Sequence, residues 1–133
     1  MNAITRTILV VDDEASLRRV LERSLSREGY RVLSCGSAEA AYSTLEAERV
    51  DAVLLDIHLP TMSGLGLYRA IVNAWSYLEG RIAIMTGDAE AEPVRTWLEK
   101  ERCVVLRKPF DLREIAVWLE SIWRNQERES GNG

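Results

Sequence analysis

Three acidic residues stand directly after short apolar runs of the sequence. Asp12 and Asp13 follow residues 8–11, which read Ile-Leu-Val-Val, and Asp56 follows residues 53–55, which read Val-Leu-Leu. Runs of this length and composition are typical of buried strands. If the two strands are parallel neighbours, the three carboxylates meet at one edge of a sheet and repel one another, so they need a cation. A hard divalent ion with oxygen ligands, Mg²⁺ or Mn²⁺, suits them best.

Two further polar residues follow apolar runs in the same way. Thr86 comes after residues 82–85, and Lys108 comes after the run at 103–106. A hydroxyl donor, an ammonium group and an acid cluster that holds a metal can together bind a phosphoryl group and stabilise its transfer. The arrangement predicts Asp56 as a carboxylate nucleophile toward phosphorus, with the two other acids holding the metal.

The elements that must position these residues alternate along the chain between strands and helices. Short apolar runs predict strands, and apolar residues at helical spacing predict helices. Strands are expected at residues 7–11, 30–34, 52–55, 81–85 and 103–106. Helices are expected at about 15–28, from an N-cap at Ser37 to about 48, across 67–75, from about 93, and at about 111–124. This alternation implies a five-stranded parallel sheet in an α/β domain with helices on both faces. Ligands of such sheets bind beyond the carboxyl ends of the strands, where all five polar residues fall.

The bulk properties fit one soluble domain. The chain has 133 residues, of which 47% are hydrophobic and 29% charged, and a net charge of −4. We expect residues 1–124 to form the domain and the polar stretch 125–133 to be a flexible tail. There is no basic stripe for nucleic acid, no apolar stretch of the roughly 20 residues that span a bilayer, and no pattern typical of a signal peptide. The sequence therefore predicts a cytoplasmic domain that binds neither nucleic acid nor membrane.

Five motifs follow one another along the chain: ILVVDDE at 8–14, LLDIHLP at 54–60, MSGL at 62–65, MTG at 85–87 and KPF at 108–110. With these motifs the chain resembles the receiver domain of two-component response regulators over about residues 7–124. The resemblance implies a doubly wound, flavodoxin-like sheet with the strand order 2-1-3-4-5. Parts of the pattern look like the receivers of hybrid sensor histidine kinases.

The resemblance also implies a role for each site residue. Carried over by motif, Asp56 is the phosphoacceptor. The metal ligands are Asp12, Asp13, Asp56 and the backbone carbonyl of His58. Thr86 is the switch hydroxyl, and Lys108 is the lysine that binds the phosphoryl group. It further implies a cis peptide bond between Lys108 and Pro109, which is plausible for an X–Pro bond in a tight turn. One departure is Val105, because many receivers carry a Tyr or Phe at this position that rotates inward with the hydroxyl residue.

The partners implied by the resemblance are those of a signalling domain. A sensor histidine kinase donates the phosphoryl group, and the domain catalyses only its own phosphorylation and dephosphorylation. Phosphorylation then changes a partner-binding surface. The domain is expected to be a monomer or a weak phosphorylation-dependent dimer, and the resemblance allows a kinase or output domain fused to it in the full-length protein.

Two other functions compete with this prediction. An aspartate-nucleophile phosphatase or phosphotransferase on a small substrate commonly carries Asp-x-Asp after its first strand and a cap insertion, whereas this chain has adjacent Asp12 and Asp13 and short loops. A receiver-like interaction module that is never phosphorylated would tolerate loss of the site residues, all of which are present here.

Overall fold

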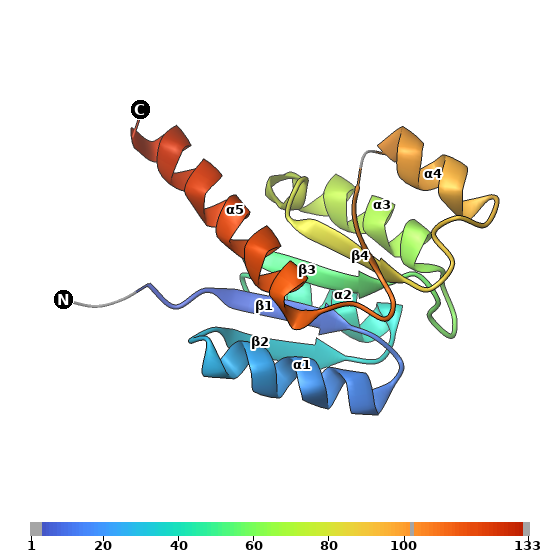
Figure 1. Ribbon diagram of the computed structural model, residues 1–133, viewed down its shortest axis with the longest axis horizontal. Coiled ribbons are helices and arrows are strands. Elements are labelled where there is room, and N and C mark those ends of the chain that lie inside the picture. Colours follow the sequence, from blue (N-terminus) through green and yellow to red (C-terminus); the bar gives the residue numbers. More distant parts are fainter. Residues whose placement is uncertain (1–3, 102, 132–133) are drawn as a thin grey trace.

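Five parallel strands form the centre of the molecule in the order β2-β1-β3-β4-β5 (Figure 1). The computed structural model describes residues 4–101 and 103–131. The strands are β1 Thr7–Val11, β2 Arg31–Cys35, β3 Ala52–Asp56, β4 Ile82–Thr86 and β5 Val104–Arg107. The predicted fold class and strand order are confirmed.

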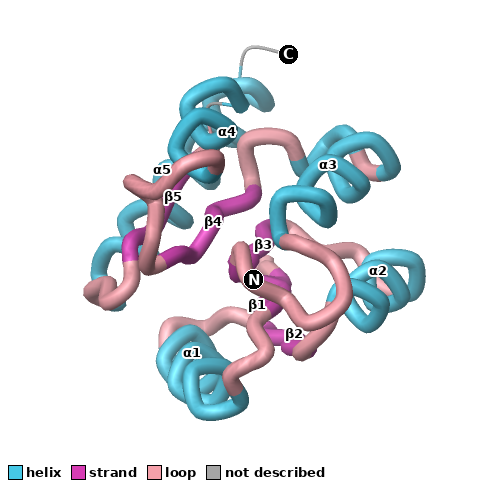
Figure 2. Tube along the Cα trace, turned by 90° about the vertical axis from the view of Figure 1, so that its right-hand side faces the viewer, coloured by secondary structure: helices cyan, strands magenta, loops and turns pink. Residues whose placement is uncertain are grey.

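The helices cover both faces of this sheet. They are α1 Ala15–Arg27, α2 Ala38–Ala47, α3 Gly64–Ala74, α4 Val94–Glu101 and α5 Leu112–Gly131, with a short 3-10 helix, η1, at Ser76–Leu78. Figure 2 shows α1 and α5 on one side of the sheet and α2 and α3 on the other. Successive strand residues serve opposite faces: Ile8 and Val10 pack with α1 and α5, and Leu9 and Val11 pack with α2, α3 and α4.

The register of the strands determines which residues meet at the carboxyl edge. Val11 pairs with Leu55, so the residues that follow them, Asp12 and Asp56, leave the sheet side by side. On the other side of β3, Thr86 pairs with Arg107, and the backbone N–H of Lys108 donates to the carbonyl of Thr86 at 2.7 Å. The sheet therefore delivers the predicted site residues to one edge.

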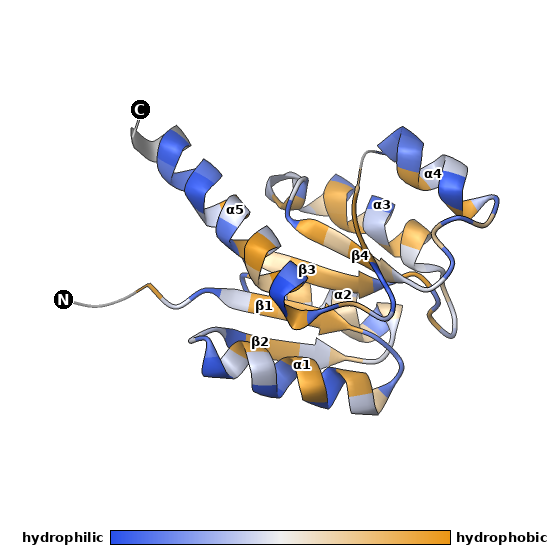
Figure 3. Ribbon diagram, in the orientation of Figure 1, coloured by the Kyte–Doolittle hydropathy of each residue, from blue (hydrophilic) through white to orange (hydrophobic). Residues whose placement is uncertain are grey.

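Helix α5 differs most from the sequence-based expectation. The predicted end near Arg124 is wrong, because the helix continues to Gly131. Residues 125–130 are polar, yet they include neither Pro nor Gly, so their composition does not require the helix to end. The C-terminal turns of α5 extend past the sheet at the end opposite the strand arrowheads (Figure 1), and Figure 3 colours much of this part of the helix as hydrophilic. The expected tail is thus helical through Gly131, and residues 132–133 lie outside the described part.

The other boundaries lie within one residue of the predicted ones, except that α3 begins at Gly64, three residues before the predicted 67. The predicted N-cap is confirmed. The Ser37 side chain accepts a hydrogen bond from the Ala40 amide at the start of α2. No helix in the described part of the chain combines the length and apolar character needed to cross a bilayer.

Candidate functional site

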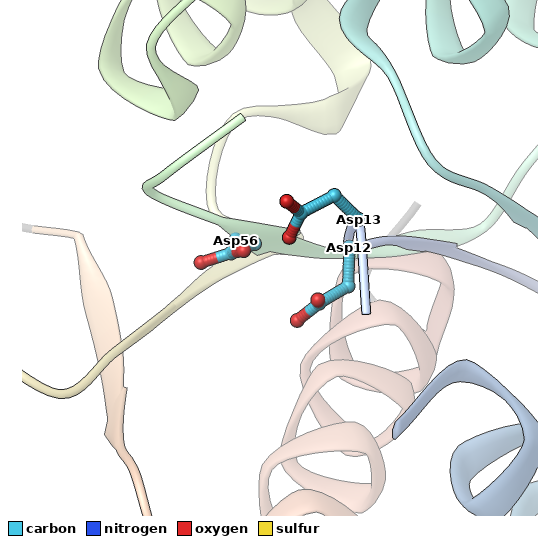
Figure 4. Close-up of side chains that lie close together, drawn as sticks. All are labelled: Asp12, Asp13 and Asp56. Atoms are coloured by element: carbon cyan, nitrogen blue, oxygen red, sulfur yellow. The ribbon is translucent and has the colours of Figure 1, made fainter. Parts of the chain in front are cut away.

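Three carboxylates gather where β1 and β3 end (Figure 4). Asp12, Asp13 and Asp56 each offer an oxygen, and these oxygens lie within 4.8 Å of one another. Asp12 is 0% exposed and Asp56 4%, whereas Asp13 is exposed. The structure thus brings together the three acids that the strand pattern predicted.

Hydrogen bonds from backbone amides orient the two buried carboxylates. Asp12 Oδ1 accepts from the Glu14 amide at 2.8 Å, and Asp56 Oδ1 accepts from the His58 amide at 3.2 Å. The second bond holds the backbone of His58 beside the acid cluster, which suits the role predicted for its carbonyl. The structure therefore leaves oxygen lone pairs of both carboxylates available to a further cation.

Lys108 is the cation that this site contains. Its Nζ lies 3.0 Å from Asp12 Oδ2 and 3.5 Å from Asp56 Oδ1, with the lysine side chain 26% exposed. Burial works to lower the pKa of the Lys108 ammonium, but the hydrogen bond to Asp12 and the charges of Asp56 and Asp12 outweigh it, so this pKa is raised. The peptide bond between Lys108 and Pro109 is cis, as predicted.

One ammonium does not balance three carboxylates. Burial raises the pKa of Asp56, and the charges of Asp12 and Asp13 add to this effect against the opposing hydrogen bond from His58 and the charge of Lys108. The excess negative charge and the all-oxygen donor set fit a hard divalent cation such as Mg²⁺. Asp12, Asp13 and Asp56 are the side chains that would hold it.

Thr86 lies at the same edge, but its hydroxyl is directed elsewhere. Thr86 is 1% exposed, and its Oγ1 donates to Asp88 Oδ1 at 2.6 Å and accepts from the Asp88 amide at 3.1 Å. The ring Nε2 of His58 lies 3.1 Å from both carboxylate oxygens of Asp88. The hydrogen bond from Thr86, and next the contact with His58, lower the pKa of Asp88. Asp88 is a site neighbour that sequence reasoning missed, although Thr-Gly-Asp is a turn signal.

Gly64 is a second residue whose role sequence reasoning missed. Its amide donates to the Ile57 carbonyl at 2.8 Å. A Cβ at this position would lie 2.2 Å from the backbone oxygen of Asp56 and 2.7 Å from the Cα of Ile57. Only glycine allows the start of α3 to approach so closely, and this approach fixes the backbone that carries Asp56.

In the metal-free protein, the Asp56→Asn change is expected to raise the free energy of unfolding at neutral pH by on the order of 1 kcal/mol. The folded state raises the pKa of Asp56 above its ordinary value of 3.8, so the folded protein binds this proton more tightly than the unfolded chain does. Stability is therefore lost as the pH rises from the unfolded pKa through the folded pKa. Asparagine does not titrate, so the advantage of the variant should grow from about pH 4 to about pH 7.

Urea unfolding in the presence of a chelator, repeated across this pH range, measures the difference. A variant less stable than the parent at neutral pH, or a difference that does not change with pH, would contradict the electrostatic account of the site.

Comparisons with known proteins agree with this geometry. The family model described as the response regulator receiver domain matches residues 8–120. The phosphate regulon transcriptional regulatory protein PhoB of Pseudomonas aeruginosa is 30% identical over 121 residues, which cover 91% of this chain and 53% of PhoB. The alkaline phosphatase synthesis transcriptional regulatory protein PhoP of Bacillus subtilis is 31% identical over 124 residues, which cover 93% and 51% of the two chains. The chain thus spans about half the length of these relatives.

Solved structures show the same fold. The signal receiver domain of an HD domain-containing protein from Pseudomonas fluorescens has a TM-score of 0.82 and 25% identity, covering 98% of this chain and 97% of that one. The response regulator TrrA from Thermotoga maritima, solved with Mg²⁺ and BeF, has a TM-score of 0.77 and 27% identity, covering 89% and 99%. With its sheet order, its acid cluster and these matches, the chain belongs to the response regulator receiver domain family of two-component signalling systems.

Proposed function

We propose that this domain accepts a phosphoryl group from a histidine kinase onto Asp56, with Mg²⁺ held by Asp12, Asp13, Asp56 and the backbone carbonyl of His58. The observation that carries the proposal is the meeting of three carboxylates and one lysine at the ends of neighbouring strands. A structural ion-pair network has no need of a third, exposed carboxylate at such a place. A site for a phosphoryl group and a divalent cation does.

The residues of the chain divide the chemistry among them. An oxygen of Asp56 attacks phosphorus, so that a carboxylate–phosphorus bond forms while the bond from phosphorus to the donor's histidine nitrogen breaks with its electron pair. The metal, when bound, neutralises charge on the transferring group and its neighbours. Lys108 is already 3.5 Å from Asp56 and needs only a small movement to bind an oxygen of the phosphoryl group. Asp12 remains fully buried and fixes the site.

The output is proposed to be the control of another domain or protein. PhoB and PhoP are named transcriptional regulatory proteins, and NtrC of Proteus hauseri is named a DNA-binding transcriptional regulator. These names support a regulator of transcription over the hybrid histidine kinase suggested by parts of the sequence. They also favour a signalling protein over an enzyme with a small substrate. The cytoplasmic location, the absence of nucleic-acid binding by this domain and its oligomeric state stay predictions.

Phosphorylation of a single residue is the expected result when the protein is incubated with acetyl phosphate and Mg²⁺. Intact mass should increase by one phosphoryl group, and peptide mapping should place it on Asp56, because this is the residue that the receiver motif assigns as phosphoacceptor and it lies in the acid cluster 3.5 Å from Lys108. Chelation of Mg²⁺ and the Asp56→Asn change should each abolish the gain.

Two outcomes would favour the competing functions. Sustained hydrolysis of small phosphate esters over many turnovers would indicate a phosphatase. No mass gain with acetyl phosphate or with any histidine kinase would indicate an interaction module that is not phosphorylated.

A further inference from the structure

The hydroxyl of Thr86 is fully engaged in the structure. A threonine hydroxyl has one hydrogen to donate, and Thr86 gives it to the Asp88 carboxylate at 2.6 Å. The Asp88 amide donates back to the same oxygen at 3.1 Å. No hydrogen bond found among residues 4–101 and 103–131 joins this hydroxyl to Asp12, Asp13 or Asp56. The hydroxyl at the edge of the phosphoryl site is therefore bound to another acceptor.

The acceptor is itself anchored across the site. Both carboxylate oxygens of Asp88 lie 3.1 Å from the ring Nε2 of His58, which follows β3, whereas Asp88 follows β4. The backbone amide of His58 in turn donates to Asp56. A continuous chain of polar contacts thus runs from Asp56 through His58 and Asp88 to Thr86. The anchor restrains an otherwise half-exposed Asp88 side chain in the position where it meets the hydroxyl.

We propose that Asp88 is a positioning residue that retains the Thr86 hydroxyl in the unphosphorylated domain, so that activation must transfer this hydroxyl from the Asp88 carboxylate to a phosphoryl oxygen. The proposal rests on the proposed function, because it supposes a phosphoryl group on Asp56. It gives a role in restraining Thr86 to Asp88, a residue of the loop after β4 that is not among the site residues predicted from the sequence.

The energetic consequence follows from the two acceptors. Hydrogen bonds to charged acceptors are stronger than bonds to neutral ones, and both the carboxylate and the phosphoryl oxygen are charged. The hydroxyl therefore exchanges one charge-assisted bond for another, and the gain on activation is the small difference between them. A neutral acceptor at position 88 would make the difference larger. The active conformation would then be favoured, and a phosphoryl mimic would bind more tightly.

The test compares the binding of beryllofluoride, a phosphoryl mimic, in the presence of Mg²⁺. Asp88→Asn is expected to bind it about three- to tenfold more tightly than the parent, the scale of the difference between a charged and a neutral acceptor. Glu90→Gln is the matched control. It also removes a carboxylate from this loop, but the Glu90 carboxylate pairs with Arg107 and not with Thr86. Its affinity should equal that of the parent. An equal gain in both variants would overturn the proposal.

A double-mutant cycle separates the retention of the hydroxyl from simple charge repulsion. In a Thr86→Ala background, the Asp88→Asn change should no longer alter the affinity for beryllofluoride. If the gain persists without the hydroxyl, Asp88 acts through its charge alone and the proposal is wrong. His58→Gln should give a gain in the same direction as Asp88→Asn but smaller, because it loosens the anchor and leaves the acceptor in place.

A measurement without metal or phosphoryl mimic tests the role of Asp88 separately from the proposed function. NMR couplings and the methyl chemical shift of Thr86 report its side-chain torsion in the unphosphorylated protein. Asp88→Asn should shift the torsion from its value in the parent, whereas Glu90→Gln should not. If beryllofluoride binds neither the parent nor any variant, the proposed function is wrong. If the Thr86 torsion is unchanged in Asp88→Asn, the proposal that Asp88 retains the Thr86 hydroxyl is wrong, whatever the result with beryllofluoride.

Discussion

Replacing Gly64 with alanine is expected to lower the free energy of unfolding by about 3 kcal/mol. The added Cβ would lie 2.2 Å from the carbonyl oxygen of Asp56 and 2.9 Å from its carbonyl carbon. Both contacts are with backbone, which cannot turn aside as the end of a flexible side chain can. The start of α3 must therefore move away from β3, or the end of β3 must deform, and the bond from the Gly64 amide to Ile57 is strained in either case.

Gly66, two residues further along α3, provides the matched control. A Cβ there meets only side-chain atoms at ordinary van der Waals separation, the nearest being Met62 Cγ at 3.5 Å. Gly66→Ala should stabilise the domain by about 0.5–1 kcal/mol, because alanine is the better helix former. Urea unfolding of both variants, with m-values compared, measures the two effects. Equal changes for the two glycines would show that the close approach of Gly64 has no energetic weight.

Replacing Lys108 with methionine is expected to lower the stability of the metal-free protein by about 2 kcal/mol. Removing one partner of a buried ion pair typically costs about 3–5 kcal/mol, and the partial exposure of this lysine reduces the effect. The change leaves Asp12 and Asp56 buried without a cationic side chain between them. Saturating Mg²⁺ should recover much of the loss, because the divalent cation supplies the missing positive charge and binds the folded state.

Lys100 is the only other lysine in the sequence and is the natural control. It is exposed in α4, and no ion pair found within the described residues includes it. Lys100→Met should change stability by less than about 0.5 kcal/mol. Thermal melts of both variants with a chelator and with excess Mg²⁺ decide the point. A loss at Lys108 that Mg²⁺ does not reduce would indicate a packing role for the lysine stem instead of charge balance.

The residues that could be predicted from the sequence are those whose position follows from the ends of strands. Asp12, Asp56 and Thr86 each complete or follow an uninterrupted apolar run, and the register of a parallel sheet brings the ends of such runs together. The roles proposed for them rest on the chemistry of carboxylates and hydroxyls, and on the resemblance to receivers.

The features that could not be predicted depend on contacts between loops. The close approach of Gly64 to Asp56 depends on how the loop after β3 folds. The hydrogen bond from Thr86 to Asp88 is accompanied by a contact between Asp88 and His58, which lies on a neighbouring loop. Neither leaves a periodic signal in the sequence. The extra turns of α5 were missed for a different reason, since residues without a core to face show no apolar spacing even when they are helical.

The unfavourable ionisation of Asp56, which is buried beside two other acids, has a consequence for the lifetime of inactive variants in a cell. Cells remove variants largely according to how often they unfold. A change that neutralises Asp56 should relieve repulsion among the three carboxylates, so we expect a variant that cannot be phosphorylated there to be degraded more slowly than the parent. If the domain receives its phosphoryl group from a histidine kinase as proposed, such a variant should still bind that kinase, because the change is confined to one side chain at the site. On the proposed function, such variants should compete with the parent for the kinase, and their abundance in a cell would not report whether signalling is intact.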